Sequence, residues 1–330
     1  MDFSGIIGQQ EVISSLKRLL SENRIGHAYI FSGSAGMGKK TVAHIFAGLL
    51  LCEKPQTGAM CGQCSACRLF KNDSNPDYQR INTEEQSIGV ELIRELQGDV
   101  AIKPVYSAHK VYVIEDAVKM TVQAQNCLLK TFEEPPSYVV ILLLTSNYEA
   151  LLETIRSRAQ HLHFSKYSRE QVTQALTDRT GKSRDLIAPA VDYSDGNIGA
   201  ALELAESGEF SRLRNQVMAF LPGIAKGKTQ DILDYSAFME EQKDNAGLLL
   251  NVMLLYYRDL LVMSETGNEN MLINSDKKDM IVHNNAARTG CSSRLIDNIE
   301  AIEAARRALK KNANYQLVID QLLFKLREDF

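Results

Sequence analysis

Residues 33–41 read GSAGMGKKT and match three of the four specified positions of the phosphate-binding P-loop pattern G-x-x-x-x-G-K-[ST]. In such a loop the backbone N–H groups surround phosphate oxygens, and the lysine reaches the terminal phosphates. The strand-like segment Ala28–Ser32 precedes the run and the helical pattern Thr41–Leu51 follows it, which is the order that a P-loop requires. The residues that we expect to contact a nucleotide here are Gly33, Gly36, Gly38 and Lys39.

One position of the P-loop pattern is wrong for metal chemistry. Lys40 stands where a hydroxyl should bind magnesium, and a protonated ammonium has no lone pair for a metal. Thr41 is one residue late, which turns its side chain by about 100° on the following helix. We keep Thr41 as a candidate ligand, because a shifted helix start could still direct it to the phosphates. The pattern predicts a nucleotide-binding fold that has lost hydrolysis.

Composition sets the broad class of protein. The chain has 330 residues, of which 45% are hydrophobic, enough for two or three cores at roughly 100–200 residues per domain. The net charge is −4, whereas a protein that binds nucleic acid alone usually carries an excess of basic residues. We therefore expect any DNA contacts to be local or shared with partners. No run of about 18 consecutive apolar residues and no signal-peptide pattern is visible, so we expect a cytoplasmic protein.

The first 165 residues alternate strand-like and helical patterns, which predicts an α/β architecture with a mostly parallel sheet. Continuous apolar runs are typical of buried parallel strands. From Ser168 to about Ser207 the helical patterns are short, and from about Gly208 onwards apolar residues recur at three- and four-residue spacing, which predicts helices. The expected strands are Ala28–Ser32, Lys110–Ile114, Val139–Thr145 and His161–Phe164, and the clearest later helices are Ala246–Met263, Ser293–Lys311 and Asn314–Arg327.

An apolar strand ends in two carboxylates, Glu115 and Asp116. In P-loop ATPases one carboxylate at this place supports magnesium and the next positions the attacking water, usually in the order Asp then Glu. The order here is reversed. Each carboxylate is thus displaced by one methylene, and a shift of about 1 Å can lower a rate on the order of 10²-fold.

Four cysteines, Cys52, Cys61, Cys64 and Cys67, have the spacing C-x8-C-x2-C-x2-C. Four thiolates suit a tetrahedral structural zinc site with no open position for water. An iron–sulfur cluster is the alternative, although the cysteine and proline that usually follow in ferredoxins are missing. Cys127 and Cys291 lie apart from this group, and we expect them to be small core residues.

Two further polar positions are candidates for the site. Thr145 ends an apolar strand, where its hydroxyl can contact nucleotide or simply stabilise a turn. Arg158 follows the short segment Ile155–Ser157, and an arginine is suited to insertion into a neighbouring phosphate site because it is planar, permanently charged and bidentate. Surface arginines are common, so this pattern alone does not assign that role.

Several segments together carry a family resemblance. They are Ile7-Gly8-Gln9, His27-Ala28-Tyr29, the four cysteines and the run AQNCLLKTFEEPP at residues 124–136. With these, nearly the whole chain resembles the delta-prime subunits of the bacterial DNA polymerase III clamp loader, which belong to the AAA+ proteins. Residues 157–159 resemble the Ser-Arg-Cys motif of that family, with Ala159 in place of the cysteine.

The resemblance implies three domains and a set of partners. We expect an AAA+ P-loop domain at 1–166 that contains the zinc module at about 52–67, a small helical lid domain at 167–207, and a helical collar or oligomerisation domain at 208–330. It implies a five-membered ring with gamma/tau and delta subunits, which loads the sliding clamp onto primed DNA. Within that ring Arg158 would be the arginine finger for a neighbouring ATPase subunit.

The family pattern also implies a nucleotide-contacting arginine in the second domain, and this chain has Gly199 there. Together with Lys40 and the reversed acidic pair, three parts of one catalytic site depart from the pattern. We therefore expect a subunit that does not hydrolyse ATP, although bound ATP or ADP is compatible with the loop. An active gamma/tau-type ATPase subunit is the alternative, and an unrelated zinc-dependent repair ATPase is disfavoured by residues 124–136.

Overall fold

The computed structural model describes the chain except residues 56–57, 83–84, 227–228, 287–291, 312 and 328–330. Cys291 therefore lies outside the described residues, whereas Cys127 is half-buried against the core, as expected. The chain divides into two compact units, Met1–Ala175 with Gly196–Ala200, and Leu176–Asp195 with Ala201–Phe330. The three-domain division at 166/167 and 207/208 stays a prediction.

The first unit contains a five-stranded parallel sheet in the order β2-β3-β4-β1-β5. Its middle strand, β4 (Val139–Thr145), is buried at every residue, as its continuous apolar sequence predicts. The predicted α/β fold with a parallel sheet is thus confirmed. The remaining strands are β1 (Ala28–Ser32), β2 (Tyr78–Ile81), β3 (Lys110–Ile114) and β5 (Gln160–His163).

Strand β2 is the one that sequence reasoning missed. It reads YQRI, and only Ile81 of these four residues is buried, because β2 is an edge strand. A short, exposed edge strand has no apolar run to reveal it.

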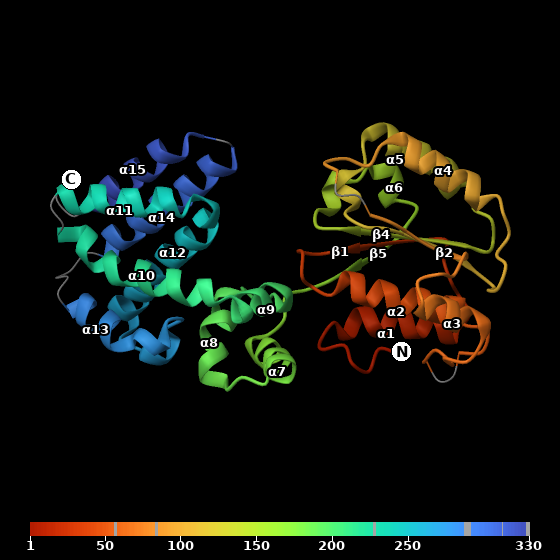
Figure 1. Cartoon of the computed structure of the whole chain (residues 1–330), viewed down its shortest axis with the longest axis horizontal. Helices are drawn as coiled ribbons and strands as arrows, with labels where there is room; N and C mark the ends of the chain where they lie inside the picture. Colours follow the sequence, from red (N-terminus) through yellow and green to blue (C-terminus); the bar gives the residue numbers. More distant parts are fainter. Residues whose placement is uncertain (56–57, 83–84, 227–228, 287–291, 312, 328–330) are drawn as a thin grey trace. The chain divides into compact units, whose positions relative to one another are not determined.

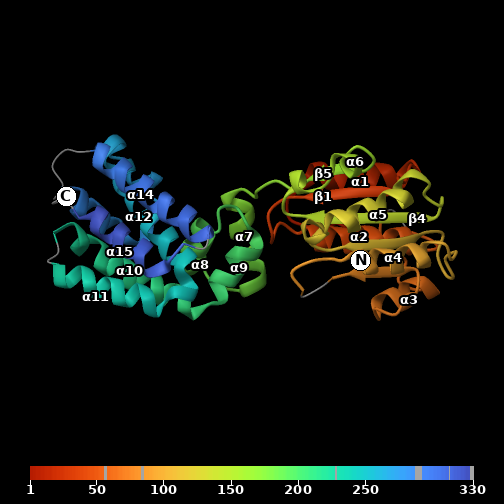
Figure 2. The same ribbon diagram turned by 90° about the horizontal axis from the view of Figure 1, so that it is seen from above.

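Helices cover both faces of the sheet, as Figures 1 and 2 show. On one face the amphipathic helices α4 and α5 bury Leu96, Leu128 and Phe132 against the sheet residues Ile141 and Leu143. This three-layer arrangement leaves the ends of the strands free for loops. The helices are α1 (Gln10–Ser21), α2 (Lys39–Leu51) and α3 (Ser65–Lys71) on one face, and α4 (Val90–Val100), α5 (Val122–Glu133) and α6 (Glu153–Arg156) on the other.

The second unit is helical. Its central helix, α12 (Ala246–Thr266), packs against α10 (Gly208–Lys226), α13 (Lys278–Ala286) and α14 (Ser292–Lys310), and its residues Met253, Tyr256 and Leu260 are buried. The helices α7 (Arg169–Thr180) and α9 (Ile198–Glu206) each begin in the first unit and end in the second. The others are α8 (Arg184–Tyr193), α11 (Thr229–Glu241) and α15 (Tyr315–Leu326).

Among the described residues, the segment Lys243–Thr266 is long and apolar enough to cross a membrane by length and composition alone. The same property is expected of the core helix of a helical domain. Asp259 of this helix is completely buried and accepts hydrogen bonds from the backbone amides of Ile273 and Asn274, at 3.0 and 2.8 Å. The segment therefore forms part of the core of the helical unit.

A buried polar network centres on Arg214 of α10. Its guanidinium donates to both carboxylate oxygens of Asp276, at 2.6 and 2.9 Å, and to Asn274 Oδ1 at 2.8 Å, and it lies over the ring of Tyr193. Although burial opposes the effect, hydrogen bonds from Arg214 lower the pKa of Asp276 below its usual value. The arginine thus ties α8 and α10 to the segment after α12.

We predict that Arg214→Met lowers the free energy of unfolding of the helical unit by about 3 kcal/mol at pH 7, because it leaves buried acceptors without their donor. Since the pKa of Asp276 is lowered on folding, the contribution of the pair is present above pH 3.8 and is lost as the pH falls towards the folded pKa. Urea denaturation at neutral and acid pH measures both effects. Arg212→Met is the control, because the side chain of Arg212 is 52% exposed, and an equal loss in both variants would contradict the prediction.

Candidate functional site

The carboxyl ends of the parallel strands meet at one edge of the sheet, and the candidate nucleotide site lies there. The P-loop follows β1, the carboxylates Glu115 and Asp116 follow β3, and Thr145 ends β4. The Gly33 amide donates to the Thr145 carbonyl at 3.2 Å, which fixes the start of the loop beside β4. The sheet thus brings together predicted residues that are about 110 positions apart in sequence.

Glycine is required at three positions of the loop. Gly33, Gly36 and Gly38 have φ values of 145°, 79° and 82°, which are accessible mainly to glycine. At Gly33 a Cβ atom would also lie 2.6 Å from the Phe164 carbonyl oxygen. Helix α2 begins at Lys39 immediately after the loop, so the partial positive charge of a 13-residue helix is directed at it.

Lys39 is buried and folds back over its own loop. Its ammonium donates to the carbonyl oxygens of Gly33 and Ser34, the latter at 2.7 Å. Burial lowers the pKa of Lys39 below its usual value, an effect that Asp116 opposes and Lys40 reinforces. The Lys39 ammonium is therefore held by the loop itself, and a bound phosphate could replace the two carbonyl oxygens as its acceptor.

Lys40, at the position of the missing hydroxyl, forms an ion pair with Glu115. Its Nζ lies 2.6 Å from Glu115 Oε2, and the Glu115 side chain is only 7% exposed. Asp116 is exposed with φ 49°, and Thr41 is exposed on the first turn of α2. Mg²⁺, which the fold type implies at such a place, does not fit these residues, because the buried carboxylate already binds a cation that offers no lone pair. Sequence reasoning identified Lys40 and Glu115 separately but did not foresee that they pair.

Tyr167 and the segment 196–200, which both belong to the first unit, bind backbone carbonyls of the P-loop, a feature that sequence reasoning missed. Tyr167 Oη donates to the Met37 carbonyl at 2.9 Å, Asn197 Nδ2 donates to the Ala35 carbonyl at 2.5 Å, and the Gly199 amide donates to the Gly36 carbonyl at 3.2 Å. A Cβ atom at Gly199 would lie 2.7 Å from Gly36 Cα. No side chain, and so no arginine, fits at residue 199 in this arrangement.

The Ile7-Gly8-Gln9 motif supports the same arrangement. Gln9 exchanges hydrogen bonds with the backbone of Ser165, accepting from its N–H and donating to its carbonyl. A Cβ atom on Gly8 would lie 2.8 Å from the ring of Tyr167. The glycine therefore allows Tyr167 to approach closely enough to reach the P-loop.

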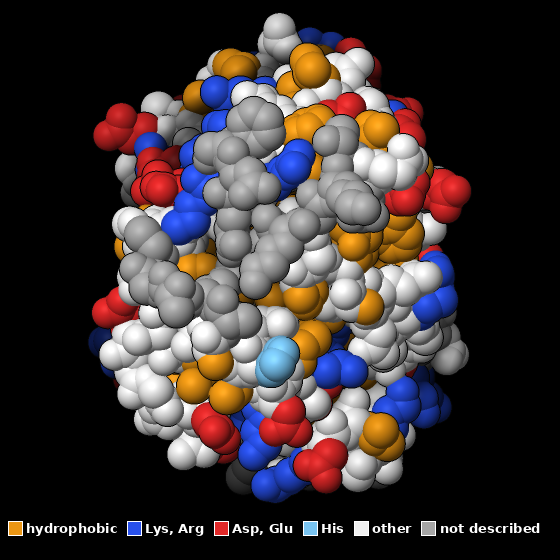
Figure 3. Space-filling model, turned by 90° about the vertical axis from the view of Figure 1, so that its left-hand side faces the viewer, with side chains coloured by type: hydrophobic (Ala, Val, Ile, Leu, Met, Phe, Trp, Pro, Cys, Tyr) orange, Lys and Arg blue, Asp and Glu red, His pale blue; other side chains and the backbone are white. Residues whose placement is uncertain are grey.

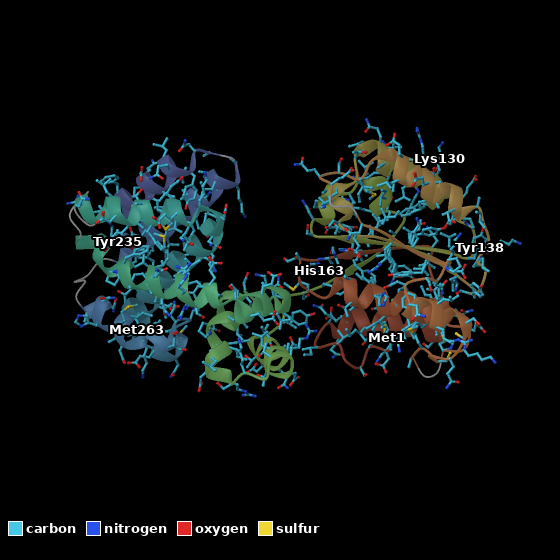
Figure 4. All side chains as sticks on the ribbon, in the orientation of Figure 1. Met1, Lys130, Tyr138, His163, Tyr235 and Met263 are labelled. Carbon is cyan, nitrogen blue, oxygen red and sulfur yellow. The ribbon has the colours of Figure 1, made fainter. Side chains whose placement is uncertain are left out.

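Two side chains at the end of β4 and β1 are satisfied locally. The Thr145 hydroxyl donates to the Asn147 carbonyl and accepts from the Asn147 amide, so it stabilises a turn. The Ser32 hydroxyl is within hydrogen-bond distance of His161 and His163, at 2.7 and 3.1 Å, and His163 is labelled in Figure 4. The role of Thr145 towards nucleotide stays a prediction. No sequence motif indicated that His161 and His163 lie together beside Ser32.

Arg158 lies outside the P-loop cluster, on the segment between α6 and β5. Its guanidinium donates to Glu133 Oε1 of α5 at 3.2 Å and to the Thr154 carbonyl at 3.1 Å, and its side chain is 38% exposed. The neighbouring Arg156 instead pairs with Glu149 and lies over the ring of Tyr148. The ion pair of Arg158 thus lies at the surface, where another anion can displace the exposed Glu133 carboxylate.

The four cysteines Cys52, Cys61, Cys64 and Cys67 come together into one cluster. Their sulfur atoms all lie within 4.8 Å of one another, and the Cys61 and Cys67 sulfurs are 3.9 Å apart. Tetrahedral Zn–S bonds of about 2.3 Å require sulfur separations of about this size. The residues therefore fit a metal ion with four thiolate ligands.

Backbone amides support the cysteine cluster. The amides of Cys61, Cys64 and Cys67 each donate to the sulfur of the preceding cysteine of the cluster, at 3.3–3.4 Å. Amides of Gln63 and Cys64 lower the pKa of the Cys61 thiol to about 6, whereas burial raises the pKa of the Cys67 thiol. A bound metal cation would stabilise these four sulfur atoms as thiolates.

Two family models match the chain. The model described as DNA polymerase III, delta subunit, matches residues 8–168, and the model described as DNA polymerase III, delta subunit, C terminal, matches residues 209–328. The two matches together account for most of both units.

Individual proteins are also similar to the chain. It is 29% identical over 325 residues to DNA polymerase III subunit delta′ of Bacillus subtilis, which covers 97% of this chain and 96% of that protein. It is 28% identical over 288 residues to subunit tau of the same organism, covering 79% of this chain and 50% of that protein. The chain thus spans half the length of the tau relative. A solved gamma-subunit-related protein of Thermotoga maritima has a TM-score of 0.46 at 18% identity, with coverage of 96% and 98%.

We predict that the purified chain contains about one zinc ion and no visible chromophore, because four thiolates close the coordination sphere. Removing the metal, or the Cys64→Ser substitution, should lower the melting temperature, since the cluster ties α2 to α3. Elemental analysis and thermal unfolding with and without chelator measure this. Cys127→Ser, which removes a thiol outside the cluster, is the control for metal content. A brown protein containing iron and sulfide would contradict the zinc prediction.

Proposed function

This chain belongs to the DNA polymerase III delta-subunit family, and from that membership we propose that it is a delta-prime-type subunit of the clamp loader. In this role it assembles with gamma/tau and delta subunits in the cytoplasm and helps to load the sliding clamp onto primed DNA. The observation that carries the proposal is similarity to a delta′ subunit along the full chain, combined with an ion pair where an ATPase needs its metal.

In the proposed role this chain does not hydrolyse ATP itself. The acidic pair cannot support Mg²⁺ while Glu115 holds Lys40, and Gly199 cannot supply the charge of an arginine. The similarity to subunit tau makes an active ATPase the second candidate. The local chemistry of Lys40 favours the first.

Arg158 is the residue that we propose acts on a neighbour. It is exposed, its carboxylate partner among the described residues is the exposed Glu133, and exchanging one anion for another requires no new burial of charge. An arginine inserted from a neighbouring subunit stabilises the negative charge of the transferred phosphoryl group. Arg158 would thus complete the ATP site of the adjacent gamma/tau subunit.

The helical unit offers apolar surface for assembly. Helices α11 and α15 pack together, and each carries an exposed leucine, Leu233 at 50% and Leu317 at 68% exposure. Figure 3 shows one end of this unit, where hydrophobic side chains lie among charged and polar ones. In the proposed role residues 208–330 are the collar that holds the ring together, residues 167–207 are the lid, and a structural zinc ion completes the P-loop domain.

We predict that Arg158→Ala lowers ATP turnover at the adjacent site by about 10³-fold, because a transition-state charge loses its partner. The measurement uses a reconstituted ring in which the other ATP sites are inactivated. Arg156→Ala is the matched control and should change turnover by less than about tenfold, since Arg156 is occupied within its own chain. Equal losses in the two variants would exclude the arginine-finger role.

A second prediction concerns assembly. The double variant Leu233→Asp, Leu317→Asp should fold normally and fail to co-elute with the other subunits, because buried apolar contacts between subunits would be replaced by charges. Leu92→Asp, an exposed leucine of the first unit, is the control for added charge. Normal co-elution of the double variant would place the assembly surface elsewhere.

A further inference from the structure

The ion pair between Lys40 and Glu115 has a consequence for ligand binding. The Lys40 side chain is 62% exposed although its ammonium lies 2.6 Å from the buried Glu115 carboxylate. We propose that the Lys40 ammonium takes the place of the divalent cation, so that this P-loop binds the phosphates of a nucleoside diphosphate without Mg²⁺.

Neither of the two groups expected to bind Mg²⁺, a carboxylate and a hydroxyl, is available to it. Glu115, the buried carboxylate that could hold it, is neutralised by Lys40, and the position before Thr41 offers an ammonium instead of a hydroxyl oxygen. A magnesium ion placed there would also face the positive charge of Lys40 directly. Mg²⁺ gives up its water ligands reluctantly and needs oxygen ligands in near-octahedral geometry, which these side chains do not supply.

The features that bind phosphate are nevertheless present. Gly33, Gly36 and Gly38 have the backbone conformation that the loop requires, and α2 begins at its end. The Lys40 ammonium has three N–H donors and uses Glu115 as one acceptor, so donors remain for phosphate oxygens. Lys39 contributes a second ammonium, which donates to the Gly33 and Ser34 carbonyl oxygens of the loop.

The balance of charge favours a diphosphate over a triphosphate. The site holds two lysines and two carboxylates: Lys40 pairs with Glu115 at 2.6 Å, and the charge of Asp116 acts on Lys39 by raising its pKa. A third phosphate would add negative charge to a site that already holds these carboxylates, and no metal would offset it. The expected ligand is therefore a metal-free nucleoside diphosphate.

The inference concerns the isolated chain and does not depend on assembly of a ring. It can fail while the arginine-finger role of Arg158 stands, and the reverse also holds. The direct test is titration of the full-length chain with fluorescent N-methylanthraniloyl-ADP, in buffer with Mg²⁺ and in buffer with EDTA. We expect dissociation constants that agree within about twofold between the two buffers, because no metal ligand is lost.

Three variants sharpen the test. Lys40→Thr frees Glu115 and restores the hydroxyl, so ADP binding should become about tenfold tighter with Mg²⁺ than with EDTA. Lys40→Met should weaken binding in EDTA about tenfold or more, because one charged donor to phosphate is lost. Lys103→Met, an exposed lysine beyond the far end of α4, is the matched control and should bind like the unmodified chain. Circular dichroism verifies that each variant is folded.

Each outcome for the unmodified chain is decisive. Equal affinity in the two buffers supports metal-free binding. Affinity that increases tenfold or more with Mg²⁺ would overturn the exclusion of the metal. Absence of binding in both buffers would overturn the inference as well, because the loop would then be a purely structural element. Tighter binding of the triphosphate than of the diphosphate in EDTA would contradict the charge argument.

Discussion

The ion pair between Lys40 and Glu115 is the interaction on which the account of this site depends. A buried carboxylate at the end of a central strand needs a partner, because an unpaired charge there would be costly. In an ATPase the partner is a metal ion held between the carboxylate, a hydroxyl and the phosphates. Here the partner of Glu115 is Lys40, the residue after the P-loop lysine. The charge of the carboxylate is thus balanced without a metal ion, and the glycine loop keeps its conformation.

The P-loop also has a structural role in the first unit. Tyr167, Asn197 and Gly199 each donate to a carbonyl of the loop, and Gly8 makes room for the tyrosine ring. The P-loop thereby connects the beginning of the chain, the end of the sheet and the segment at 196–200.

Much of the fold could be predicted from local patterns. The apolar strand β4 and the P-loop after β1 have strong signals, because buried parallel strands and glycine-rich turns restrict sequence severely. The cysteine cluster also followed from spacing. Strand β2 was invisible because it is short and exposed, and the partner of Lys40 was not predictable, since it comes from a strand about 75 positions away whose register only the folded sheet fixes.

The proposal on which this account depends is that the chain does not turn over ATP itself. The most direct measurement is steady-state ATP hydrolysis by the purified chain, with sliding clamp and primed DNA present. We predict no turnover above that of a Lys39→Ala variant. Robust turnover that Lys39→Ala abolishes would contradict the account and identify the chain as an active motor subunit, in which Lys40 and Gly199 are tolerated.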